Sequence, residues 1–122
     1  MKADKPIVVL VSKNLVFLPR IEAAAGSTLK VRRLTNLDLA ETLIKENEIK
    51  AIIVDLEEEK SLWKPALRKL NKYLHETNQN VISIAYGPHE DTKSMHEAQE
   101  MGCEHTLTKG AFVNQLRSLL HP

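Results

Sequence analysis

Short hydrophobic runs alternate along the chain with segments in which apolar residues recur at helical spacing. Residues 7–11, 51–54 and 81–85 are nearly uninterrupted apolar runs rich in β-branched side chains, which are typical of strands buried on both faces of a parallel sheet. Residues 28–34 alternate between polar and apolar side chains, which favours a strand at the edge of the sheet. Residues 103–108 predict a last strand.

Five further segments place their apolar residues on one side of a helix, and each follows a predicted strand. The first lies within residues 15–25, where Pro19 interrupts the pattern and predicts a helix that begins near Leu18 or is kinked there. The other four carry their apolar residues at helical spacing: Leu39, Ala40, Leu43 and Ile44; Leu67, Leu70 and Leu74; Met95, Ala98 and Met101; and Phe112, Leu116, Leu119 and Leu120.

Three residues are expected to mark helix ends. Pro65 is expected to open the third helix at its first position, where proline is tolerated, so that residues 56–65 form an exposed loop. Asp91 suits the N-terminal cap of the fourth helix, and Gly102 suits a left-handed position after its end. Trp63 then lies in the loop, where it would pack against its own helix, cover the site as a lid or anchor a partner.

The alternation of strands and helices predicts the fold class. Parallel strands need crossover connections, so the chain is expected to form a doubly wound α/β fold with a five-stranded parallel sheet. The flavodoxin-like strand order 2-1-3-4-5, with helices on both faces, suits a chain of 122 residues. Neither repeats nor linker-like segments interrupt the pattern, so we expect a single domain over residues 1–122.

Composition and charge exclude several classes of function. Seventeen Lys and Arg against sixteen Asp and Glu give a net charge of +1, which provides no strong attraction to nucleic acid or to a membrane surface. The basic residues Lys30, Arg32 and Arg33 are interpreted as charge that protects an edge strand. Cys103 is the single cysteine and is expected in the core; with no apolar segment long enough for export, the chain is expected to be cytoplasmic.

Polar residues follow the predicted strands. In open parallel sheets, functional groups gather beyond the carboxyl ends of the strands. The residues that this rule selects are Ser12, Lys13 and Asn14 after the first strand, Asp55 after the third, Gly87, Pro88 and His89 after the fourth, and Thr108 and Lys109 after the fifth.

Two motifs resemble the receiver domain of response regulators (the CheY-like family), and the resemblance covers nearly the whole chain. Residues 52–56, Ile-Ile-Val-Asp-Leu, resemble the strand that carries the phospho-acceptor aspartate. Residues 84–89, an acidic helix start and then residues 101–109 resemble the family's fourth strand, its Gly-containing corner and the strand that ends in a lysine, here Lys109. The resemblance implies a bacterial two-component signalling module that is not an enzyme.

The sequence departs from this family at the residues that handle metal and phosphate. Ser12 and Lys13 match the acidic pair that holds Mg²⁺, and Gly87 matches the Thr or Ser that contacts the phosphoryl group, so the resemblance implies a degenerate pseudo-receiver without a cofactor. We expect Asp55 to remain as an ion pair with Lys13 and Lys109, which would lower its pKa. The acidic residues 57–59 would repel a phosphodonor.

Other candidate sites are weaker. The spacing of His89, Glu90, Asp91 and His96 matches no established metal site, so no metal is expected. Residues 12–17 lack the glycine pattern of a nucleotide-binding loop and the hydroxyl-rich loop of flavodoxins, so neither a nucleotide nor a flavin cofactor is expected.

The leading hypothesis is a stand-alone pseudo-receiver that acts through protein contacts. By resemblance, the surface of the fourth helix, fifth strand and fifth helix would contact a partner or form a homodimer, through Met95, Glu97, Glu100, His105, Gln115 and Arg117. One alternative is a working receiver phosphorylated at Asp55 by a histidine kinase. Another is a sensor in which Lys13, Asn14 and Lys109 hold an anionic ligand.

Overall fold

A computed structural model describes residues 5–122 and contains one parallel β-sheet. The elements alternate along the chain in the order β1 (Ile7–Val11), α1 (Leu18–Ala25), β2 (Lys30–Arg33), α2 (Leu39–Glu46), β3 (Ile49–Asp55), α3 (Lys60–Glu76), β4 (Ile82–Gly87), α4 (Thr92–Glu100), β5 (His105–Thr108) and α5 (Lys109–Leu120). The strands are ordered β2-β1-β3-β4-β5, and every pair is parallel. The predicted fold class is confirmed.

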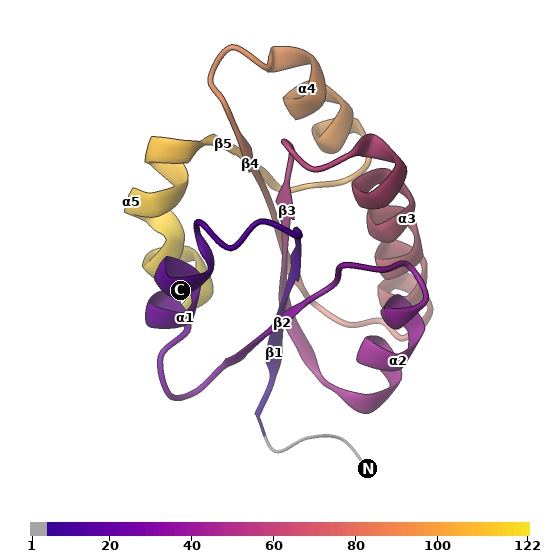
Figure 1. Cartoon of the computed structure of the whole chain (residues 1–122). Helices are drawn as coiled ribbons and strands as arrows, with labels where there is room; N and C mark the ends of the chain where they lie inside the picture. The colour runs from indigo at the N-terminus through magenta and orange to yellow at the C-terminus, as the bar shows by residue number, and fades with distance from the viewer. Residues whose placement is uncertain (1–4) are drawn as a thin grey trace.

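Helices cover both faces of the sheet (Figure 1). Helices α1 and α5 lie on one face, and α2, α3 and α4 lie on the other. Each residue of β1 is fully buried, with Ile7, Val9 and Val11 in one core cluster and Val8 and Leu10 in the other. This double burial explains why the strand is a continuous apolar run. Within residues 5–122, none of the helices combines the length and the hydrophobicity needed to cross a membrane.

Several predicted element boundaries are confirmed. Helix α1 begins at Leu18, with Pro19 in its first turn. The Asp91 carboxylate accepts a hydrogen bond of 3.1 Å from the backbone N–H of Ser94 and caps α4. Gly102 has a φ of +102° after the end of α4, a conformation that favours glycine. Strand β2 is a short edge strand in which Val31 is half-buried and the other residues are exposed.

The prediction for the start of α3 is wrong. The helix begins at Lys60, and Pro65 lies inside it rather than at its first position. Trp63 is therefore a fully buried helical residue, and its proposed roles as a lid or an exposed anchor are wrong. The side chains of Leu62, Trp63 and Leu67 pack together in the core, and burial of a tryptophan offsets the cost of a proline inside the helix.

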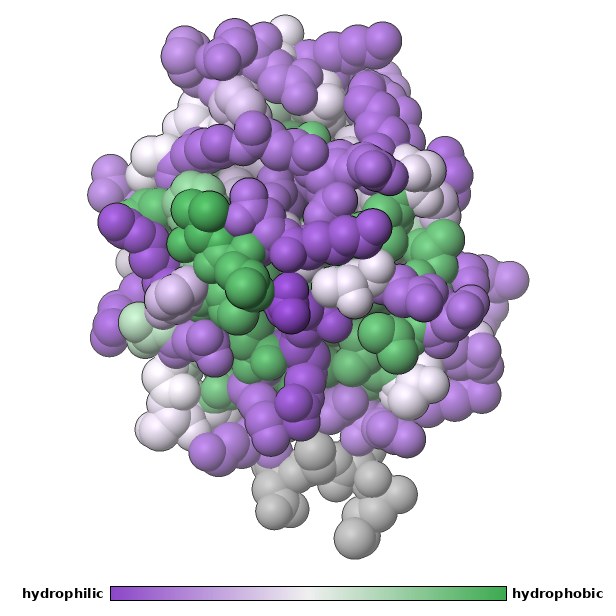
Figure 2. Space-filling view, in the orientation of Figure 1, coloured by the Kyte–Doolittle hydropathy of each residue, from purple (hydrophilic) through white to green (hydrophobic). Residues whose placement is uncertain are grey.

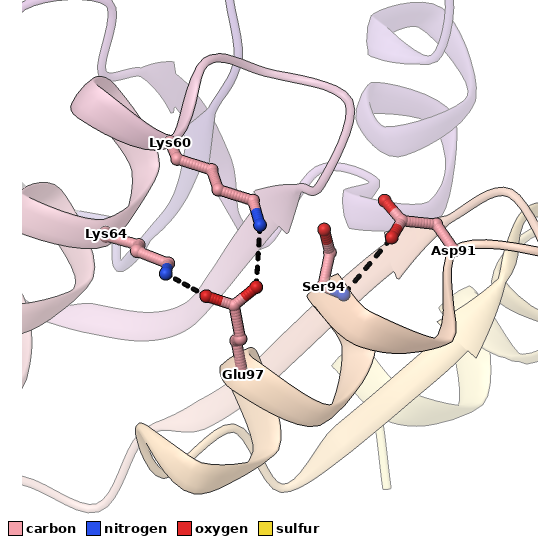
Figure 3. Close-up of polar contacts among 5 residues, drawn as sticks. All are labelled: Lys60, Lys64, Asp91, Ser94 and Glu97. Carbon is pink, nitrogen blue, oxygen red and sulfur yellow. Dashed lines mark hydrogen bonds and ion pairs between the residues drawn. The ribbon is translucent and has the colours of Figure 1, made fainter.

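Ion pairs join α3 to α4 (Figure 3). The Nζ atom of Lys60 lies 2.6 Å from Oε1 of Glu97, and the Nζ atom of Lys64 contacts Oε2 of the same carboxylate. Hydrogen bonds from these two lysines lower the pKa of Glu97 to about 2. Glu97 therefore lies on the side of α4 that faces α3.

Candidate functional site

Asp55 stands at the carboxyl end of β3 and is 4% exposed. The hydroxyl of Ser12, which is fully buried directly after β1, donates a hydrogen bond of 2.9 Å to Oδ2 of Asp55. The backbone N–H of Glu57 donates one of 2.9 Å to Oδ1. Because β1 and β3 run in parallel with Val11 opposite Val54, the first residue after β1 lies beside Asp55. The structure thus brings together Ser12 and Asp55, as the sequence predicted.

The pKa of Asp55 is raised, and the expected lowering by two lysines is wrong. Burial is the main cause, and the nearby carboxylates of Glu57 and Glu58 add to it. The hydrogen bonds from Ser12 and from the N–H of Glu57 act in the opposite direction. Asp55 is therefore a buried carboxyl group held by neutral donors.

The two lysines contact residues 57–59, the acidic loop, instead of Asp55. The ammonium group of Lys109 forms an ion pair with Glu57. The side chain of Lys13 is exposed, and its backbone N–H donates a hydrogen bond of 2.6 Å to Oε1 of Glu58. The acidic loop thus spans the site from the β1–α1 loop to the start of α5. From the sequence, these glutamates were expected only to repel a phosphodonor.

The residue of β4 beside Asp55 is Tyr86, not Gly87. The strand register places Tyr86 directly opposite Asp55, whereas Gly87 lies beside Leu56. A Cβ atom at Gly87 would lie 3.1 Å from Cβ of Leu56, so this position is crowded by Leu56. A shift of one residue along a strand reverses the face to which a side chain points. Tyr86 is therefore the residue of β4 paired with Asp55, and the match of Gly87 to the family's Thr or Ser stays a prediction.

Tyr86 belongs to an aromatic cluster that supports this end of the sheet. Its ring stacks on Phe112 with a centroid separation of 4.2 Å, and Phe17 meets it edge-on at 5.2 Å. Burial and the adjacent Asp55 raise the pKa of Tyr86, so its hydroxyl stays neutral at physiological pH. Tyr86 could not be selected from the sequence, because the face to which its side chain points depends on the exact register of β4.

The remaining loop residues have local roles. Oδ1 of Asn14 accepts a hydrogen bond of 2.9 Å from the N–H of Val16, and the N–H of Asn14 donates one of 3.0 Å to Oγ of Ser12. The hydroxyl of Thr108 accepts from the N–H of Ala111 and caps α5. Asn14 thus shapes the turn that positions Ser12 rather than contacting Asp55.

The histidines near the site form surface contacts. His89 pairs with Glu90 at 3.0 Å, and His96 pairs with Glu100 at 2.9 Å along α4. Within residues 5–122, no group of three His, Cys, Asp or Glu side chains is placed to hold a metal ion. Cys103 is buried as expected, and burial raises the pKa of its thiol to about 12.

The six residues predicted for a partner surface do not all point outward together. Glu97 pairs with α3, and the guanidinium of Arg117 lies 3.5 Å from the carbonyl oxygen of Ala23 in α1. Met95 and His105 are half-buried. Glu100 and Gln115 are exposed, and so is Arg117 apart from this contact with α1.

Two large aliphatic side chains are exposed beside the site. Leu15 and Val16, in the loop between β1 and α1, are 54% and 68% exposed, and hydrophobic side chains gather on this surface in Figure 2. Nη1 of Arg33 lies 3.4 Å from the carbonyl oxygen of Lys13, so basic side chains border them. In the sequence, the two aliphatic residues directly after Asn14 are the signal for this surface.

The structure was compared with known proteins, and the similar structures are receiver domains of response regulators. No family model matches the chain, and no curated protein matches it. A receiver domain from Clostridium thermocellum superposes with a TM-score of 0.70 and 18% identity, covering 94% of this chain and 90% of its own. A response regulator from Thermotoga maritima superposes with a TM-score of 0.68 and 14% identity. The match covers 97% of this chain and 99% of that one.

A third similar structure comes from a signalling complex. It is the Saccharomyces cerevisiae co-crystal structure of the histidine phosphotransfer protein Ypd1 with the receiver domain of its response regulator Ssk1. The match has a TM-score of 0.63 and 18% identity, and covers 86% of this chain and 79% of the other. At these identities the likeness concerns the fold, so we conclude that this chain has the fold of response-regulator receiver domains.

Proposed function

We propose that this chain is a receiver-like regulatory module, a pseudo-receiver, that acts through protein contacts and does not use Mg²⁺-dependent phosphorylation. The observation that carries the proposal is the state of Asp55, which is 4% exposed and accepts hydrogen bonds from Ser12 and the N–H of Glu57. A phospho-acceptor needs an accessible, ionised carboxylate. Burial and a raised pKa both oppose that requirement.

The side chains around Asp55 do not fit the magnesium ion that the receiver fold implies. Mg²⁺ demands oxygen ligands in near-ideal octahedral geometry. Both oxygens of Asp55 already accept hydrogen bonds, and the hydroxyl of Ser12 points its proton at one of them. The residue after Ser12 is a lysine, whose charge repels a cation.

The contacts of the acidic loop also oppose binding of a phosphoryl group or another anion. The ammonium of Lys109 is already paired with the Glu57 carboxylate, so an incoming anion would have to displace Glu57. The carboxylates of Glu57 and Glu58 lie near Asp55 and raise its pKa, so they would also repel an anion placed there. The same contacts thus weigh against the anion-sensor alternative.

We place the partner contact on the surface of Leu15 and Val16, with Lys13 and Arg33 at its border. Large exposed aliphatic side chains on an ordered loop favour a protein interface. The turn at Asn14 and a backbone hydrogen bond of 3.2 Å from Leu18 to Leu15 hold this loop in shape. The partner surface would be apolar with acidic side chains around it.

A titration with Mg²⁺ tests the metal part of this proposal. Amide chemical shifts are followed in the native chain and in two double variants. The first is Ser12→Asp with Lys13→Asp. The second, Thr28→Asp with Lys30→Asp, is the control, because it makes the same change in net charge at exposed positions away from Asp55. We expect saturable shifts around Asp55 only in the first variant, because it restores two carboxylates beside Asp55. Saturable shifts around Asp55 in the native chain would contradict the proposal.

A further inference from the structure

Strand β2 forms one edge of the sheet, and part of its backbone has no partner strand (Figure 1). The N–H of Leu34, directly after β2, donates a hydrogen bond of 2.8 Å to the carbonyl oxygen of Leu10 in β1. Because N–H groups point alternately to the two sides of a strand, those of Val31 and Arg33 point away from β1. Among the strands of residues 5–122, none pairs with this outer side of β2.

The side chains along this edge are strongly basic. Lys30, Arg32 and Arg33 are exposed, and Nη1 of Arg33 lies 3.4 Å from the carbonyl oxygen of the equally exposed Lys13. None of these four cations forms an ion pair with another residue that the structure describes. Glu22 is the single acidic residue between positions 13 and 33. Like charges therefore oppose pairing of β2 with the same strand of a second copy, and they favour an acidic partner.

The two faces of this edge differ in character. Val31 packs against the core cluster of α1 and α5, so the alternation of side chains places Lys30 and Arg32 on the opposite face, toward α2. The exposed Leu15 and Val16 stand on the loop that enters α1, and the next residues of this loop pack against the same cluster as Val31. An extended segment that alternates acidic and apolar side chains therefore matches the two faces of β2.

From this arrangement we propose that β2 binds an extended acidic segment of a partner protein, which pairs with the outer side of the strand and adds a strand to the sheet. The outward N–H groups of Val31 and Arg33 hydrogen-bond to its backbone, and its carboxylates pair with Lys30 and Arg32. The proposal rests on the protein contact of the proposed function, whose binding mode it names, and it does not depend on the state of Asp55.

An acetylated and amidated hexapeptide of alternating glutamate and valine is the probe for an NMR titration of the full chain. We expect saturable amide shifts at residues 29–34 and 13–17. We also expect slower hydrogen exchange at the N–H groups of Val31 and Arg33, because the bound peptide accepts hydrogen bonds from both. The same peptide with lysine in place of glutamate should cause neither change.

Two double variants test the role of charge. Lys30→Glu with Arg32→Glu should weaken binding of the glutamate peptide at least about tenfold. Arg68→Glu with Lys72→Glu makes the same change in net charge at exposed positions of α3, and it should bind the peptide as the native chain does.

The proposal is wrong if the peptide causes no saturable shifts, if it binds without slowing exchange at Val31 and Arg33, or if the variant with two glutamates in β2 binds it as the native chain does. Shifts confined to residues 13–17 would keep the partner contact of the proposed function and reject strand pairing. Slowed exchange with shifts confined to residues 29–34 would support strand pairing and reject that contact.

Other occupants of this edge give different results. Exchange at Val31 and Arg33 that slows with rising concentration of the chain alone would assign the edge to a second copy and overturn the proposal. Tighter binding of hexathymidylate than of the peptide at residues 29–34 would overturn it in favour of nucleic acid.

Discussion

Asp55 is a buried carboxyl group whose hydrogen-bond donors are neutral, and this makes the stability of the folded chain depend on pH. Its raised pKa means that the folded chain keeps this proton to a higher pH than the unfolded chain does. The stabilising contribution is complete below the unfolded pKa of about 3.9 and is lost as the pH rises through the folded pKa.

The variant Asp55→Asn has no proton to lose at this position and keeps an oxygen that can accept a hydrogen bond. We expect its melting temperature at pH 7 to exceed that of the native chain by about 2–5 °C, with the difference vanishing near pH 4. Thermal unfolding monitored by circular dichroism gives the melting temperatures of the variant and the native chain at each pH. Asp38→Asn, at an exposed position, serves as the control. A loss of stability of the same size at both pH values would contradict this account.

The contacts of Asp55 show which side-chain partners can be predicted from a sequence and which cannot. Ser12 was correctly placed beside Asp55. Both residues stand at the carboxyl ends of buried, neighbouring parallel strands, so the strand order alone is enough to predict that they lie together. The expected ion pair with Lys109 failed because Glu57, two residues after Asp55, takes that ammonium group. Which of several nearby carboxylates a flexible lysine contacts depends on loop geometry that periodicity does not describe.

At the scale of elements, one carboxylate of α4 forms both ion pairs that join this helix to α3. Glu97 pairs with Lys60 and Lys64, and its pKa falls to about 2. Because the pKa of Glu97 is lower in the folded chain, its carboxylate stabilises the fold at pH values above the pKa of glutamate in the unfolded chain. This contribution is lost as the pH falls through about 2.

We therefore expect Glu97→Gln to lower the melting temperature at pH 7, and this loss to shrink steadily as the pH is lowered below about 4. Its pH dependence is opposite to that of Asp55→Asn, so the two variants act as internal comparisons. Glu22→Gln, at an exposed position in α1, controls for loss of a surface charge. A melting temperature equal to the native value at pH 7 would show that this carboxylate does not hold α4 against α3.

Element boundaries were predictable where a local signal decides them and not where packing does. The cap at Asp91 and the left-handed Gly102 are local signals, and both predictions are confirmed. The start of α3 was misplaced because Pro65 is a local signal that burial of Trp63 overrides. Tyr86 could not be placed beside Asp55 from the sequence, because a shift of one residue in register reverses the face to which a side chain points.

For the whole molecule, the strand order and the placement of helices on both faces followed from the sequence. Doubly buried strands such as β1 have a distinctive composition, and the geometry of parallel connections leaves few topologies. The fold alone does not state a function, because one fold carries many different sites. The claim that this chain lacks receiver chemistry rests on Asp55 and its neighbours.

The measurement that tests this claim most directly is the intact mass of the native chain during incubation with acetyl phosphate and Mg²⁺. A receiver domain that accepts phosphate from the same donor is run in parallel as the positive control, and Asp55→Asn identifies the modified residue. We predict that the native mass stays unchanged, because Asp55 is buried and Lys109 is engaged by Glu57. The addition of one phosphoryl group to the native chain, absent in Asp55→Asn, would contradict the account.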